Sequence, residues 1–197
     1  MCIRDRTFSI ASPALAMLEL SKGKLTSQPE RHSGEGLFFT SRLADVFDLH
    51  ANDAAFQQRA WDERGWHPQR ALRHAGTSIY AAFAMDTPRT LDAVRRAYSV
   101  GNDDPHGVKF SRTVVPLRLI TSAFEGLESR AQARRVCARL GEFRRAEIDF
   151  GGVASVGHAF ADELFRVFGP AQGALELVPV NMTPAVAALV ASVRRAV

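Results

Sequence analysis

The sequence predicts an α/β protein, and the clearest indication is the alternation of strand-like and helix-like segments in its second half. Short runs rich in Val and Ile are followed by segments whose apolar residues recur every three or four positions, and the connections are short. Strands that are joined through helices run parallel, so this order indicates a mostly parallel sheet flanked by helices. A hydrophobic content of 46% with 23% charged residues is typical of a globular chain that buries a core.

A cluster of turn-forming residues at 101–109 is the clearest break along the chain. We expect an incomplete α/β unit at 7–88, a linker helix and loop at 89–108, and a compact α/β domain at 109–197. The predicted strands and helix of the first unit are too few to bury much on their own, so this unit either packs tightly on the second or lacks part of a domain.

The domain at 109–197 begins with a strand and a helix. The β-branched run at 114–120 predicts a strand, which Pro116 places at an edge or at a strand's start. Ser129 is the expected N-cap of a helix over 129–140, because its hydroxyl can accept a hydrogen bond from the first turn. The residues expected on the buried face of this helix are Ala133, Val136, Cys137 and Leu140, and those on its solvent face are Arg130, Arg134, Arg135 and Arg139.

The same alternation continues to the end of the chain. A strand is predicted at 146–150, a helix at 158–168 and a third strand at 175–180. Thr183 is expected to cap a last helix, with Pro184 at its favoured first position. The residues expected to point inward from the helix at 158–168 are Phe160, Leu164, Val167 and Phe168.

The first half has weaker signals. Residues 18–33 are polar and contain Gly and Ser, which predicts a loop, and a helix is expected over 33–47. Strand-like runs at 55–61 and 76–85 precede a helix at 90–99.

Composition limits the classes of function. The net charge of +4 is modest for 197 residues, so nucleic acid binding through this chain is not expected. The two cysteines, Cys2 and Cys137, form no disulfide framework, which favours a reducing cytoplasm. No apolar run approaches the roughly 20 residues that a membrane span needs, so no membrane segment is expected.

Two phrases in the second half carry a family resemblance, which extends over about 110–197. They are Asp149-Phe150-x-Gly152-Val153 and Ala159-Phe160-Ala161-Asp162-Glu163-Leu164-Phe165-Arg166-Val167-Phe168, supported by Ser129-Arg130-x-Gln132-Ala133 and Pro179-Val180-Asn181. They resemble the STAS-like domain of unknown function found in bacterial regulators. The resemblance implies a protein-interaction module that contacts another regulatory protein. The residues expected at the contact surface are Gly152, Gly157, His158 and Asp162.

Neither phosphorylation nor catalysis is expected in this half. STAS antagonists of anti-sigma factors carry a phosphorylatable serine at the start of the helix after the Asp-containing strand. That position falls at His158, and Ser155 lies earlier in the turn. Asp162 and Glu163 are expected in the first turn of a helix, where carboxylates are favourable for structural reasons alone. We therefore predict no catalytic residue and no metal ligand.

Glycine-containing motifs of the first half carry a second resemblance. They are Leu20-Ser21-Lys22-Gly23-Lys24, Ser33-Gly34-Glu35-Gly36-Leu37-Phe38-Phe39 and Gly76-Thr77. They resemble the lid, the second glycine box and the Gly-Thr box of a GHKL-type ATPase domain, the fold shared by histidine kinases and anti-sigma-factor kinases. Backbone N–H groups at such a glycine-rich helix start can approach phosphate, whereas Lys22 is expected to be a solvated loop lysine. The implied nucleotide-contacting residues are Ser33, Gly34, Glu35, Gly36 and Thr77.

The resemblance to GHKL-type domains departs from the family at two places. The helix with the metal-binding Asn and the Asp-x-Gly-x-Gly box that contacts adenine are absent from the sequence. We therefore expect the chain to be a fragment that begins inside the ATPase domain. ATP and Mg²⁺ are implied ligands of the full-length protein, and this chain alone is not expected to bind them well.

Together these features predict a cytoplasmic bacterial signalling protein of the partner-switching type, with a STAS-like domain coupled to an ATP-binding GHKL-like domain. We expect no enzymatic activity of this fragment. Two alternatives remain open for the full-length protein: an ATP-dependent protein kinase of the anti-sigma-factor or histidine-kinase type, and a transcriptional regulator whose DNA-binding part is missing. The sequence does not indicate an oligomeric state.

Overall fold

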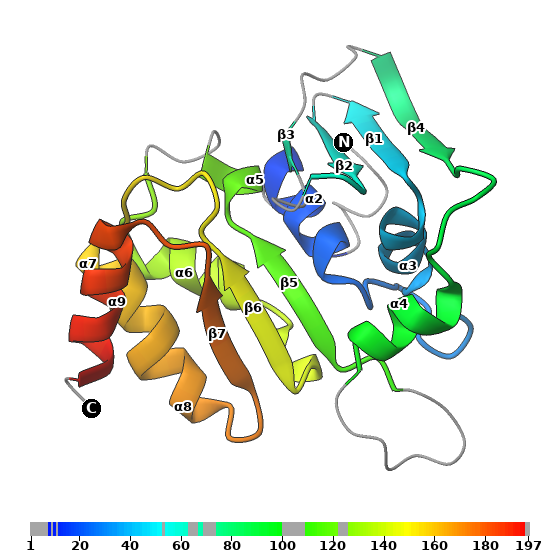
Figure 1. The fold of residues 1–197 in the computed structure, drawn as a ribbon. Helices are drawn as coiled ribbons and strands as arrows, with labels where there is room; N and C mark the ends of the chain where they lie inside the picture. The colour runs from blue at the N-terminus through cyan, green and yellow to red at the C-terminus, as the bar shows by residue number, and fades with distance from the viewer. Residues whose placement is uncertain are drawn as a thin grey trace. The chain divides into compact units, whose positions relative to one another are not determined.

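The structure, a computed structural model, describes residues 8, 10, 12–52, 54–62, 67–68, 74–99, 109–121 and 126–195. The chain divides into two compact units, Met1–Ala97 (unit 1) and Tyr98–Val197 (unit 2). Each unit combines helices with a β-sheet (Figure 1), which confirms the predicted α/β class.

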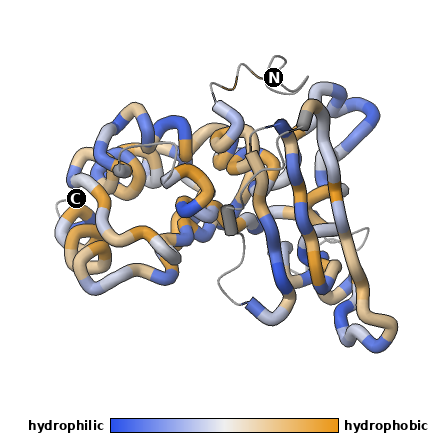
Figure 2. The backbone as a smooth tube through the Cα atoms, turned by 90° about the horizontal axis from the view of Figure 1, so that it is seen from above, coloured by the Kyte–Doolittle hydropathy of each residue, from blue (hydrophilic) through white to orange (hydrophobic). Residues whose placement is uncertain are grey.

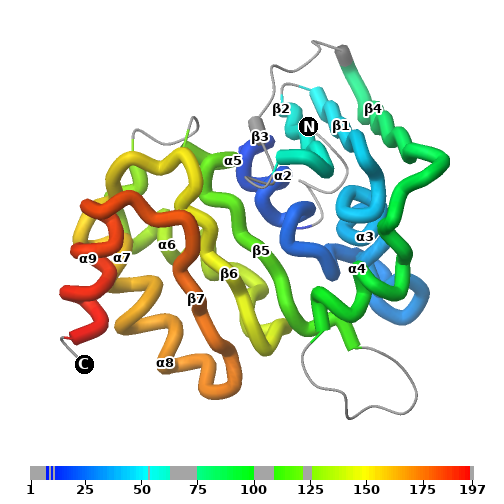
Figure 3. The backbone as a smooth tube through the Cα atoms, in the orientation of Figure 1, coloured from blue at the N-terminus to red at the C-terminus, as the bar shows by residue number. Residues whose placement is uncertain are grey.

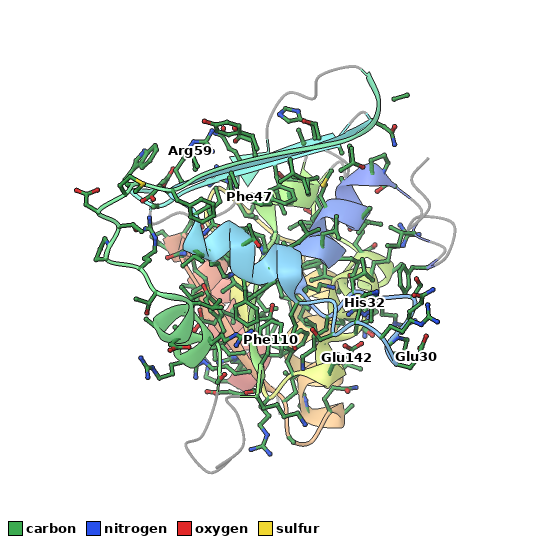
Figure 4. The ribbon with its side chains drawn as sticks, turned by 90° about the vertical axis from the view of Figure 1, so that its right-hand side faces the viewer. Glu30, His32, Phe47, Arg59, Phe110 and Glu142 are labelled. Carbon is green, nitrogen blue, oxygen red and sulfur yellow. The ribbon has the colours of Figure 1, made fainter. Side chains whose placement is uncertain are left out.

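Unit 1 is built on an antiparallel sheet. Its strands are β1 Val46–Asn52, β2 Ala54–Arg59, β3 His67–Pro68 and β4 His74–Ala82, in the order β3-β2-β1-β4. Apolar and polar residues alternate along β1 (Figure 2), and the apolar Phe47 and Leu49 are buried. Successive strand residues face opposite sides of a sheet, so this alternation gives the sheet one buried face. Figure 4 shows Phe47 pointing from the sheet toward the helices of this unit.

The helices described in unit 1 are α2 Pro13–Lys22, α3 Gly36–Leu43 and α4 Leu91–Ala97. The hydroxyl of Ser12 caps α2 by accepting a hydrogen bond from the Leu15 N–H at 3.3 Å. Phe38 of α3 is fully buried, and the rings of Phe47 and Phe56 stack with centroids 5.9 Å apart. The aromatic side chains of α3, β1 and β2 therefore supply much of the core of this unit.

Two predictions for unit 1 are wrong. The helix predicted over 33–47 ends at Leu43, because Val46 begins a strand whose apolar residues recur at every second position. The loop predicted over 18–33 starts only after Lys22, because the capped helix α2 extends to that residue. The elements confirmed with small shifts at their ends are the strands predicted at 55–61 and 76–85 and the helix predicted at 90–99.

Unit 2 contains the predicted parallel sheet. Its strands are β5 Arg112–Pro116, β6 Arg145–Asp149 and β7 Glu176–Val180, in the order β5-β6-β7. The three arrows point the same way in Figure 1, so the carboxyl ends of the strands lie at one edge. We call the residues that follow these ends, 117–118, 150–152 and 181, the carboxyl edge.

Helices accompany this sheet. They are α5 Arg118–Thr121, α6 Arg130–Cys137, a 3-10 turn at Leu140–Glu142, α7 His158–Asp162, a π-helix at Glu163–Phe168, α8 Gly169–Ala171 and α9 Pro184–Arg195. α7 contacts both α6 and α9, and the tube in Figure 3 shows these helices beside the sheet. Ser129 caps α6 and Thr183 caps α9, as predicted. The residues predicted to be buried, Ala133, Val136, Cys137 and Leu140, are all buried, although α6 ends at Cys137 and Leu140 lies in the 3-10 turn.

The strand predicted over 114–120 ends at Pro116, and the chain turns into α5. Leu119 and Ile120 are buried in that short helix. A short apolar run indicates burial but does not separate a strand from a buried helix, which explains the error.

The helix predicted over 158–168 changes type half-way. Its second half is the π-helix Glu163–Phe168, and there Phe165 is buried at 6% exposure while Val167 is 38% exposed. A π-helix bonds each residue to the fifth along rather than the fourth, so its inward positions shift along the sequence. The inward orientation predicted for Phe160 and Leu164 is confirmed, that predicted for Val167 is wrong, and Phe168 is half-buried.

Candidate functional site

The carboxyl edge of unit 2 is organised by Asp149. This buried carboxylate accepts hydrogen bonds through Oδ1 from the N–H of Gly151 at 2.8 Å and from Nδ2 of Asn181 at 2.9 Å. The bond from Asn181 ties the end of β6 to the end of β7, and the bond from Gly151 closes the turn that follows β6. Asp149 therefore holds the turn in place, and Gly152 stands exposed on it with φ of +78°.

Gly157 and His158 lie at the start of α7. The N–H of Gly157 donates to the carbonyl of Leu127 at 2.8 Å, and a Cβ on Gly157 would lie 2.9 Å from backbone atoms of Glu128. The glycine is thus explained by the close approach of two backbone segments. The His158 side chain is exposed, which leaves it available to a partner.

Asp162 and Glu163 are buried and take part in a network of ion pairs. Arg130 of α6 binds both carboxylates, with 2.7 Å to Asp162 and 3.3 Å to Glu163. Nε of Arg134 donates a hydrogen bond to Oε1 of Glu163 at 2.7 Å. Arg166 donates hydrogen bonds to both carboxylate oxygens of Asp162. The network joins α6 to α7 and to the π-helix. Asp162 is buried and bound by arginines, so its side chain is not presented to a partner.

The hydrogen bonds from Arg166 lower the pKa of Asp162, and attraction to Arg166 and Arg130 acts in the same direction, while burial opposes the shift. In the unfolded chain an aspartate titrates at about 3.9. A lowered folded-state pKa gives stability that is complete above that value and is lost as the pH falls through the folded pKa.

Asp162→Asn is therefore expected to lower the urea midpoint of unfolding at pH 7, with a difference from the wild type that shrinks below about pH 4. Glu142→Gln is the control, because Glu142 pairs with Arg139 on the surface by an i,i+3 contact. A difference for Asp162→Asn that stays constant down to pH 2 would show that the charge of Asp162 contributes nothing.

The glycine box of unit 1 lines a cavity of about 470 Å³. Its lining residues are Leu20, Leu25, Arg31, His32, Ser33, Gly34, Glu35, Gly36 and Leu37. Figure 4 shows His32 in the segment that precedes α3. The structure thus brings together the predicted residues Ser33, Gly34, Glu35 and Gly36, while Thr77 lies opposite Ala51 in β4 and is not part of the lining.

The two glycines of this box differ in what surrounds them. Gly34 has φ of +70°, and a Cβ there would lie 2.7–2.9 Å from backbone atoms of Lys24 and Leu25. Packing against the chain therefore requires Gly34. Gly36 is the first residue of α3 and lines the cavity. Among the described residues, no atom beyond its chain neighbours and its own helix backbone lies within 4 Å of its Cβ position, so the space beside it is open.

Lys22 is not the solvated lysine that the sequence predicts. It is fully buried at the end of α2 and pairs with Glu19, one turn earlier in the same helix. The prediction was wrong because it placed Lys22 in a loop, whereas α2 carries it into the core.

Among the residues that the structure describes, no group of three or more His, Cys, Asp or Glu side chains is placed to hold a metal ion. Within the same residues, no helix is both long and apolar enough to cross a membrane.

Residues 132–187 match the family model of the STAS-like domain of unknown function (DUF4325). The chain contains a STAS-like domain. The match begins in α6 and ends in α9, so it includes the turn after β6 and the arginine–carboxylate network except for Arg130. The resemblance predicted from the sequence is confirmed for these residues, and the resemblance of unit 1 to GHKL-type domains stays a prediction. No curated protein and no solved structure matches the chain.

Sequence reasoning did not single out Arg118, which precedes the segment matched to the STAS-like domain and lies on its carboxyl edge. The guanidinium of Arg118 lies beside Gly152, 3.6–3.7 Å from the position that a Cβ would take there. The sequence placed Arg118 inside the strand predicted over 114–120, whereas it lies two residues after the end of β5 at Pro116.

Proposed function

We propose that the chain belongs to a regulatory protein in which the STAS-like domain binds another protein, and in which unit 1 binds the phosphates of a nucleotide that controls this contact. The observation that carries the first part is the exposed turn at the carboxyl edge, which lies inside the segment that matches the STAS-like family. Ligands of open parallel sheets bind at that edge, where the connections are free to vary.

The exposed side of this turn supports a protein contact. Gly152, Ser155 and His158 are exposed, while Val153 and Val156 between them are buried. The buried valines anchor the turn, so the exposed residues are presented at fixed positions. A contact surface of this kind needs no rearrangement of the domain.

The start of α3 supports the nucleotide part. The Glu35 side chain does not cap this helix, so the N–H groups of its first turn lack a side-chain partner there. They lie at a cavity that Arg31 and Gly36 also line. An uncapped helix start with a cation nearby attracts the oxygens of a phosphate.

Gly36→Ala is expected to weaken Mg-ATP binding at least tenfold while it changes the free energy of unfolding by no more than about 1 kcal/mol. Apart from its chain neighbours and its own helix backbone, the added methyl group lies within 4 Å of no atom of the described residues, but it narrows the approach of phosphate to the helix start. Calorimetric titration with Mg-ATP measures the affinity, on this chain and on a form extended upstream. Ser27→Ala, an exposed change outside the cavity lining, is the control.

Hydrogen exchange of the same samples tests the coupling. We expect Mg-ATP to protect the amides of 34–38 and to alter exchange at 151–158. If millimolar Mg-ATP leaves both segments of both forms unchanged, the nucleotide part of the proposal is wrong. Protection at 34–38 alone would mean that unit 1 binds nucleotide without controlling the STAS-like domain.

A further inference from the structure

Arg118 is distinguished by buried hydrogen-bond donors that lack acceptors. Its Nε and Nη1 atoms are buried, and neither has a partner within the described residues. Arg112 and Arg145 also have a buried Nε without an acceptor, but both form ion pairs with Glu147. In the described part of the chain, no carboxylate lies within 4.0 Å of the Arg118 guanidinium. A guanidinium that is removed from water without an acceptor is unfavourable unless something else binds it.

Arg118 lies next to the exposed turn at Gly152. Arg118 begins α5 directly after the end of β5, and the residue as a whole is half-buried. The guanidinium lies against Gly152, since a Cβ on this glycine would lie 3.6–3.7 Å from its Cζ, Nη2 and Nε atoms. Gly152 is itself exposed. A small group that docks on the turn therefore lies beside the guanidinium.

Asp149 is the acidic residue of the carboxyl edge, and it does not neutralise Arg118. Its Oδ1 accepts from Gly151 and from Asn181, and the side chain is buried among the strand ends. It forms no ion pair with Arg118, since the two groups are more than 4.0 Å apart. The carboxyl edge thus offers a positive charge next to an exposed turn, and the carboxylate of Asp149 is already engaged in holding that turn.

We propose that Arg118 and the turn at Gly151 and Gly152 form a binding site for an oxyanion, a carboxylate or a phosphate group, which the protein partner supplies. The assignment to a partner rests on the function proposed above. Planar guanidinium groups bind both kinds of oxyanion through paired N–H donors, which a lysine does not reproduce.

The test is an NMR titration of the whole ¹⁵N-labelled chain with inorganic phosphate and, separately, with acetate, at constant ionic strength. We expect saturable shifts of the Arg118 Nε–H and of the Gly151 and Gly152 amides. Arg118→Gln is expected to weaken binding at least tenfold. Arg144→Gln, which removes an equal charge from an exposed position of the same unit, is expected to change it less than twofold.

The outcomes distinguish a phosphate group from a carboxylate, and they distinguish this site from the nucleotide site proposed in unit 1. Saturation by phosphate alone indicates a phosphorylated group, and saturation by acetate as well indicates a carboxylate. Equal affinity of Arg118→Gln and the wild type, or shifts that never saturate, would overturn the site. Arg118→Lys retains the charge and the aliphatic stem, so it replaces Arg118→Gln if that variant does not fold. The amides of Gly34 and Gly36 report separately on phosphate in unit 1.

Discussion

Lys22→Ala is expected to lower the free energy of unfolding by about 3–5 kcal/mol, because removal of one partner from a buried ion pair is strongly destabilising. Lys22 is fully buried and Glu19 is 6% exposed, so water cannot replace the lost ammonium group. The substitution also removes the aliphatic stem of the lysine from the core. Urea unfolding at pH 7, followed by circular dichroism, measures the change.

The double variant Glu19→Gln/Lys22→Met is the control for this prediction. It removes both charges and keeps most of the buried volume, so it is expected to regain most of the lost stability. A loss below about 1 kcal/mol for Lys22→Ala would instead place Lys22 at the surface, as a mobile lid lysine would be.

Phe165→Ala is expected to destabilise the STAS-like domain by about 3–5 kcal/mol, and Val167→Ala by less than about 1 kcal/mol. Phe165 is buried, its ring lies 6.4 Å from that of Phe150, and the Arg194 guanidinium lies 4.9 Å above it. Val167 is partly exposed on the same π-helix. Thermal unfolding measures the loss of stability in each of the two variants.

This pair of variants tests the π-helix itself. A regular α-helix over 158–168 would turn Val167 inward with Phe160 and Leu164, and Val167→Ala would then be clearly destabilising. A larger loss for Val167→Ala than for Phe165→Ala would therefore contradict the structure. Phe165→Ala removes more side-chain volume than Val167→Ala, so the two losses are not directly comparable. The deciding result is whether Val167→Ala destabilises the domain more than a surface substitution does.

The parts of the fold that the sequence predicts are those with local causes. The N-caps at Ser129 and Thr183 and the buried face of α6 follow from short-range hydrogen bonds and from periodicity. The end of α3 and the π-helix do not follow from such local causes. Val46 continues an apolar pattern that a helix also permits, and only pairing with β2 and β4 selects the strand.

The candidate sites divide in the same way. Ser33, Gly34 and Gly36 were found because glycine at a helix start is a local signal, and the structure brings them to one cavity. Thr77 was predicted with them but lies elsewhere in the fold. Arg118 was missed because its distinguishing property, buried donors without acceptors, depends on the packing of segments far apart in the sequence.

The turn after β6 is fastened at both of its ends. Asp149 secures the first end through Gly151 and Asn181, and the Gly157 N–H secures the second through the carbonyl of Leu127. A loop closed in this way has little conformational entropy left to lose. A partner that docks there meets a preorganised surface, so the ordering that accompanies binding falls on the partner, and changes in the partner's own flexibility will tune the affinity of the complex.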